Sequence, residues 1–123
     1  MSVMISLSAL ENNDTTYVMQ VTYNTAPINT PFFGMQTPFS LTGYTPKVLT
    51  KASSATPDAS ATTYTVGSGL TLVSALLGEI SWVLPHTASI VQTPGTYWWR
   101  LDLVDGSGNV GTALYGNLYV IAV

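Results

Sequence analysis

The most unusual property of this sequence is how little charge it carries. Its 123 residues include three Lys or Arg and six Asp or Glu, so charged side chains make up 7% of the chain and the net charge is −3. Average proteins contain roughly a quarter charged residues. A nucleic-acid-binding protein sets clustered basic side chains against the phosphates, and three cations are too few for that. The six carboxylates are too scattered for an acidic tail or a cation store.

Cysteine and long apolar runs are also missing. Without cysteine there are no disulfides, no thiolate chemistry and no cysteine-bound metal, so the hydrophobic core must hold the fold. No apolar run approaches the roughly 18 residues of a membrane helix. The first ten residues lack a basic start, and Ser2, Ser6 and Ser8 interrupt their apolar residues. We therefore expect neither a signal peptide nor membrane insertion.

The length predicts one domain, residues 1–123, with a sizeable core. A soluble monomer is usually given a surface with about 25–35% charged residues, which this chain cannot reach. Its surface must consist mainly of Thr, Ser, Asn and Gln with apolar atoms between them. We expect that surface to lie against other protein, in a homo-oligomer or a multi-copy assembly.

Apolar and polar residues alternate with a period of two along most of the chain. Thr, Tyr, Val and Trp are frequent and the best helix formers are scarce, which favours strands. Seven or eight short strands separated by turns predict an all-β fold, an antiparallel β-sandwich. The expected strands cover residues 4–10, 15–23, 44–53, 70–73, 79–84, 96–104 and 110–123.

Two long segments interrupt this alternation. Residues 24–34, with Pro27 and Pro31, are expected to form a loop or an irregular edge. Residues 53–69 are mainly Ala, Ser and Thr, which predicts a long polar loop. Loops of that length are uncommon in compact domains and usually have a function or move. The glycine-rich residues 105–109 predict a hairpin turn.

The sequence offers little for catalysis or metal binding. His86 is the one histidine, and it follows Pro85 with no nucleophile-elbow glycine pattern nearby, so a turn or surface histidine is expected. Among the six acidic residues, only Glu79 and Asp102 fall on expected strands. We therefore do not expect the inward-facing pair of carboxylates that a glycosidase needs. Residues 105–109 resemble a calcium loop, but the twelfth position is Gly116. We expect no catalytic residue, no metal and no cofactor.

The aromatic residues leave two interpretations open. Trp98 and Trp99 are adjacent and must point to opposite faces of a strand, and Trp82 and Trp99 fit the core. Trp98 is then exposed, and an exposed Trp beside an Arg is typical of a protein-interface hot spot. The alternative is a platform on which sugar rings stack. The expected protein interface comprises Trp98, Arg100 and Asp102 on one strand, Met4 on the N-terminal strand, and Phe32 and Phe33 in the Pro-rich loop.

Residues 94–99, Pro-Gly-Thr-Tyr-Trp-Trp, resemble part of an immunoglobulin-like sandwich. The Gly-x-Tyr spacing is similar to a tyrosine corner, although Thr93 replaces the acidic residue two positions before the glycine. Trp99 stands where an antibody domain has its second cysteine.

A longer resemblance covers residues 14–123, carried by the order and spacing of its segments. These are 14–21, the Phe-Ser-Leu-Thr-Gly of 39–43 followed by Val48, 78–84, the Pro-Gly-Thr-Tyr of 94–97, and 101–108. In this order they resemble the N-terminal immunoglobulin-like domain of phage baseplate upper proteins and its relatives in tail, fibre and capsid-associated proteins. Residues 53–69 are longer than expected for that family, and we expect the attachment part alone, without the further C-terminal part that reaches the receptor-binding protein.

The resemblance implies an immunoglobulin-like, non-enzymatic attachment module in a bacteriophage virion. The expected role is a small decoration or adaptor protein docked on capsid, tail or baseplate proteins, with no nucleic-acid or membrane partner. The candidate docking elements are residues 1–10, as an arm or edge strand, residues 26–38, and the face that carries Trp98 and Arg100. An exposed strand edge would let a partner add a strand without any charge. The alternative is a carbohydrate-binding module for adhesion to the host surface.

Overall fold

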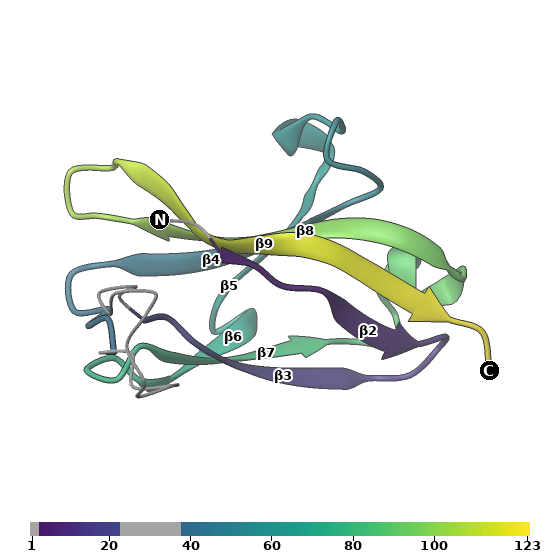
Figure 1. The fold of residues 1–123 in the computed structure, drawn as a ribbon, viewed down its shortest axis with the longest axis horizontal. Coiled ribbons are helices and arrows are strands. Elements are labelled where there is room, and N and C mark those ends of the chain that lie inside the picture. The colour runs from purple at the N-terminus through teal and green to yellow at the C-terminus, as the bar shows by residue number, and fades with distance from the viewer. Residues whose placement is uncertain (1–2, 23–37) are drawn as a thin grey trace, which may run out of the picture.

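The computed structural model describes residues 3–22 and 38–123, where the alternating sequence forms nine strands and two short 3-10 helices (Figure 1). The strands are β1 Val3–Met4, β2 Leu7–Leu10, β3 Thr15–Gln20, β4 Thr45–Lys51, β5 Thr62–Val66, β6 Gly69–Ser74, β7 Glu79–Leu84, β8 Gly95–Val104 and β9 Val110–Ile121; the 3-10 helices are η1 Asp58–Ser60 and η2 Ser89–Gln92.

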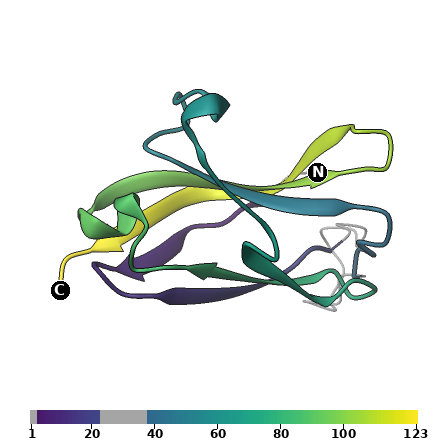
Figure 2. The same cartoon turned by 180° about the vertical axis from the view of Figure 1, so that it is seen from behind.

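The strands form two layers that face each other (Figures 1 and 2). One layer contains β9, β8 and β4, with β1 and β2 beside β9; the other contains β6, β7 and β3. Strand β5 pairs with β4 and, over two residues, with β6, so it joins the layers. Most pairs are antiparallel, but β1 and β2 run parallel to β9, and β5 runs parallel to β6. The predicted immunoglobulin-like β-sandwich is confirmed, with these parallel pairings added.

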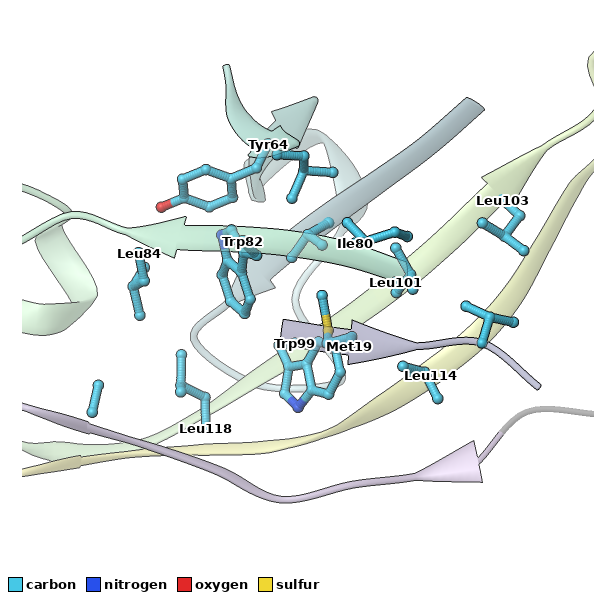
Figure 3. Packing of buried hydrophobic residues seen from close by; sticks show 14 of the residues in the cluster. Met19, Tyr64, Ile80, Trp82, Leu84, Trp99, Leu101, Leu103, Leu114 and Leu118 are labelled. Carbon is cyan, nitrogen blue, oxygen red and sulfur yellow. The ribbon is translucent and has the colours of Figure 1, made fainter. Parts of the chain in front are cut away.

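Two stacked tryptophans occupy the centre of the core (Figure 3). Trp82 of β7 and Trp99 of β8 are fully buried, and their ring centroids lie 6.0 Å apart with an interplanar angle of 26°. Tyr17 and Tyr64 pack against Trp82, with ring centroids at 5.1 and 5.5 Å. Aromatic pairs of this kind contribute about 0.5–1.5 kcal/mol each beyond the area they bury. Trp99 therefore fills the place where the resemblance put a cysteine.

The tyrosine corner suggested by residues 95–97 is present. The Tyr97 hydroxyl donates a hydrogen bond to the Thr93 carbonyl at 2.7 Å, although Thr93 replaces the usual acidic residue. The turn at 105–109 also forms as predicted, since the Asp105 carboxylate accepts the backbone N–H groups of Ser107 and Asn109, both at 2.9 Å. These bonds lower the pKa of Asp105.

Two segments differ from the sequence-based expectation. Residues 53–69 were expected as one polar loop, which is wrong for 62–66: β5 forms there because β4 provides a ladder and Tyr64 buries its ring. The expected N-terminal strand is split at Ile5 and Ser6. Both halves pair with β9, so the described part of the N-terminal segment is an edge strand of its own domain.

The split in the N-terminal strand lies where it crosses β9 at Gly116. The Ile5 N–H donates to the Tyr115 carbonyl at 2.8 Å, and the Ile5 carbonyl accepts the buried Trp99 indole N–H at 3.0 Å. A Cβ at Gly116 would lie only 2.0 Å from that carbonyl oxygen. The absent side chain therefore lets the N-terminal strand reach Trp99.

Candidate protein interface

The outer face of the β4–β8–β9 layer carries the central residues of the predicted interface. On β8, Trp99 and Leu101 point into the core, so Trp98, Arg100 and Asp102 point outward. In the strand register, Trp98 of β8 has Lys51 of β4 on one side and Asn117 of β9 on the other. The prediction that these three β8 residues share an outer face is confirmed.

Asp102 is not an exposed rim residue, because its side chain is fully buried. It accepts hydrogen bonds from Arg100 Nε, at 3.0 and 3.1 Å to its two oxygens, and from the Thr112 hydroxyl at 2.8 Å. A buried carboxylate needs such partners, since an unpaired one would cost several kcal/mol. Asp102 therefore acts as a fixed anchor for Arg100 beneath the surface, and it offers no contact to a partner protein.

Arg100 holds a second carboxylate with the other side of its guanidinium. Its Nη1 and Nη2 donate to the two oxygens of Asp58 in η1, at 3.0 and 2.6 Å, and Lys51 forms an ion pair with the same carboxylate. The two cations, Arg100 foremost, hold the pKa of Asp58 far below its ordinary value, and Asp58 in turn raises the pKa of Arg100. Lys51, Asp58, Arg100 and Asp102 form what we call the charge clamp.

The charge clamp fixes the segment between β4 and β5 against the outer face. That segment projects above the sheet (Figures 1 and 2). The Lys51 side chain is only 5% exposed and that of Arg100 21%. Both cations are neutralised within the molecule, so neither is free to meet a partner's acid.

The part of this face that remains available is neutral and aromatic. Trp98 is half-buried against Tyr115 of β9, with ring centroids 5.5 Å apart at 42°. Register puts Met4 of β1 beside Tyr115, and the Met4 side chain is 56% exposed. Further along β9, Asn117 donates to the Tyr119 hydroxyl at 3.2 Å. We call these five residues the aromatic strip.

The structure thus unites part of the predicted interface. Met4 and Trp98 both lie beside Tyr115, whereas Arg100 and Asp102 belong to the charge clamp. Phe32 and Phe33 lie outside the described residues. Five contributors were not predicted from the sequence: Lys51, Asp58, Tyr115, Asn117 and Tyr119. The alternation of Tyr115, Asn117 and Tyr119 could have predicted an exposed face of β9. No signal in the sequence indicates that Asp58 pairs with Arg100, which lies 42 residues further along the chain.

Potential chemical groups elsewhere do not converge. His86 Nδ1 lies 2.8 Å from the Asp14 carboxylate, which also accepts the His86 backbone N–H at 2.6 Å. These bonds lower the pKa of Asp14, and both side chains are exposed. Within residues 3–22 and 38–123, no three His, Asp or Glu side chains group together as metal ligands would. No helix in those ranges is long and apolar enough to cross a membrane.

An open groove of about 440 Å³ lies at the end of the sandwich near the 105–109 turn. Its lining residues include Val21, Phe39, Tyr44, Val110 and Asp105. The Asp105 carboxylate is occupied by its own turn. The groove is therefore mainly apolar, and its one carboxylate is already hydrogen-bonded.

Comparisons with known proteins give a similarity in fold only. No protein-family model and no curated protein matches the chain. Among solved structures, one described as a structure of murine CRIg aligns over 94% of this chain and 92% of its own, with 11% sequence identity and a TM-score of 0.41. The β-sandwich is seen directly in the strand order and register of this chain.

Proposed function

We propose that this chain is a non-enzymatic structural component of a bacteriophage virion, a small decoration or adaptor protein that docks on capsid, tail or baseplate proteins. The observation that carries the proposal is the scarcity of unpaired charge on its surface. A protein that is permanently packed against other proteins needs few surface charges for solubility, whereas a free enzyme or lectin needs more surface charge to stay soluble.

Six of the nine charged side chains already have a salt-bridge or hydrogen-bond partner within the molecule. Four form the charge clamp, and Asp14 and Asp105 are hydrogen-bonded by His86 and by their own turn. Within the described residues, Glu11, Lys47 and Glu79 form no ion pair. The accessible surface is 7058 Å², so the remaining charges are very sparse.

Exposed apolar side chains are spread over the same surface. The most exposed are Val123, Leu76, Val18, Met4 and Val110, at 87, 74, 69, 56 and 56%. Single exposed apolar residues are ordinary in soluble proteins, but here there are few charges between them. Contacts with a partner would consist of apolar packing and backbone hydrogen bonds, and the aromatic strip is the candidate hot spot.

The proposal is tested on particles of the phage that encodes the chain. Mass spectrometry of purified particles should detect the protein at a fixed copy number; hundreds of copies would indicate decoration and a handful an adaptor. Recombinant protein should co-sediment with particles that lack it, and Trp98→Ala should weaken this, whereas Val73→Ala, on the opposite layer, should not. Absence from purified particles together with no co-sedimentation would refute the proposal.

A carbohydrate-binding role is the second candidate, and the half-exposed Trp98 beside Tyr115 is the observation that favours it. Sugar rings stack on such aromatic faces. Trp82 and Trp99 are buried and unable to contribute. A glycan array and tryptophan fluorescence titration separate the two functions: glycan-dependent quenching that Trp98→Ala abolishes would support this role, and a silent array would remove it.

A further inference from the structure

Strand β3 ends the strand order and has an open edge. It pairs with β7 on one side, and no described strand lies on its other side (Figures 1 and 2). The Val21 N–H donates to the Gly78 carbonyl and the Val21 carbonyl accepts the Phe39 N–H, both at 2.9 Å on the β7 side. Since backbone groups alternate along a strand, Thr16, Val18 and Gln20 direct their N–H and C=O groups to the open edge.

Within the described part of the chain, β3 itself carries none of the sequence features that normally prevent strands from pairing between molecules. Natural edge strands are protected by charged residues, proline, bulges or shortness. Strand β3 is six residues long, contains no charge and no proline, and pairs with β7 without a register shift. Thr16, Val18 and Gln20 are all exposed, Val18 at 69%. The other end of the sheet is different, because β2 has four residues and its Ser8 carbonyl already accepts the Tyr17 hydroxyl at 2.7 Å.

We propose that β3 pairs antiparallel with β3 of a second copy around a two-fold axis at Val18. Each Val18 then lies opposite its symmetry mate, and each Thr16 lies opposite Gln20 of the other copy. All three positions direct their backbone groups to the edge, so this register forms more hydrogen bonds than a register shifted by two residues in either direction. The three-stranded layers of the two copies become one continuous six-stranded sheet.

The chemistry of the edge favours a second copy as the occupant. In the free chain, water hydrogen-bonds the N–H and C=O groups of this edge, and another extended strand can replace that water along the whole row of groups. A two-fold interface must be complementary to itself, and here Val meets Val and Thr meets Gln, with no like charges opposed. The nearest acids are Asp14, which is bonded to His86, and Glu79, which lies across from Gln20 within the sheet. The low net charge of −3 adds little repulsion between copies.

The inference specifies the multi-copy assembly of the proposed function and rests on it to that extent, but its test needs only the purified chain. Sedimentation equilibrium should show a mass that rises with concentration from 13.1 kDa toward twice that value. An interface limited to one strand edge is small, so a weak dimer is expected. A chain that stays monomeric at millimolar concentration would overturn the inference, even if it were present in particles.

Charge pairs placed at positions 16 and 20 test the register. In Thr16→Lys/Gln20→Lys, two cations oppose each other twice across the axis, so the dimer should weaken about tenfold. In Thr16→Glu/Gln20→Lys, opposite charges meet and the dimer should persist. Both variants carry the same change beside Glu79, which keeps their folding comparable. Thr71→Lys, exposed on β6 away from the edge, is the control and should dimerise like the parent chain.

A cysteine cross-link gives an independent readout, since the chain has no cysteine of its own. Opposed residues of a hydrogen-bonded antiparallel pair have Cα atoms about 5.5 Å apart, which a disulfide can span. Val18→Cys should therefore oxidise to a covalent dimer much faster than Thr71→Cys. Equal rates, or a Thr16→Lys/Gln20→Lys variant that dimerises as the parent does, would assign self-association to another surface and refute the β3 pairing.

Discussion

The crossing of the N-terminal strand over Gly116 allows a sharp test of how the sandwich is closed. In Gly116→Ala, the new methyl group would lie 2.0 Å from the Ile5 carbonyl oxygen and 2.8 Å from the Ile5 carbonyl carbon. Both atoms are backbone, so the strand must move away. Two hydrogen bonds depend on its position, from Ile5 N–H to Tyr115 and from the Trp99 indole to Ile5.

The loss can be estimated from those two bonds. Each contributes a net of about 1 kcal/mol, and leaving the buried Trp99 indole N–H without an acceptor costs about 1–3 kcal/mol more, part of which overlaps with the bond it loses. We expect Gly116→Ala to lower the free energy of unfolding by about 2–4 kcal/mol. The matched control is Gly111→Ala on the same strand, where a Cβ has nothing within 4 Å. It should be neutral or stabilise the fold by up to about 1 kcal/mol, because alanine loses less backbone entropy.

Urea denaturation followed by tryptophan fluorescence measures both variants, and hydrogen exchange locates the change. In Gly116→Ala, the amide of Ile5 and those of β2 should lose protection before the rest of the sheet does. If the two alanine variants have the same stability and the N-terminal amides remain protected, the close approach at Gly116 does not hold the strand, and the reasoning is refuted.

Three further predictions concern the clamp and the core. Arg100 and Lys51 lower the pKa of Asp58 below its ordinary 3.8, so the stabilisation from this carboxylate is complete above that pH and declines as the pH falls further. Asp58→Asn should remove this part of the acid dependence of the urea midpoint. Tyr97→Phe, which loses the 2.7 Å bond to the Thr93 carbonyl, should cost about 0.5–1.5 kcal/mol by the same denaturation assay. Trp82→Ala should cost about 3–5 kcal/mol by calorimetry, since its ring is fully buried between three aromatic neighbours, and a loss below 1 kcal/mol would contradict that packing.

The strands that the sequence predicts best are those bounded by strong turn signals. Residues 79–84 coincide with β7, and 96–104 differ from β8 by one residue, since Pro85 and Gly95 mark their limits. Strand β5 could not be predicted, because Tyr64 is its one buried residue in a polar stretch. Its strand conformation comes from the ladder that β4 supplies, which is a tertiary effect.

The candidate interface was predictable as a face but not as a set of contacts. Alternation alone put Trp98, Arg100 and Asp102 on one side of β8. It could not show that Asp102 is buried, because Asp102 is bonded to Thr112 across the ladder and to Arg100, which itself holds Asp58 from 42 residues upstream. Charged residues on an outward face are ordinarily assumed to be solvated. Here the path of the β4–β5 segment places Asp58 over them.

The scarcity of charge and the open β3 edge are connected through where the charges lie. A soluble β protein commonly protects an edge with Lys or Glu, because a charge resists desolvation between two strands. This chain has nine charges and places four in the charge clamp, on the layer opposite β3. The clamp fixes one face while the edge of the other layer stays neutral. Such a distribution would favour aggregation in a protein that must remain alone, but it suits one whose edge is occupied by another copy of itself.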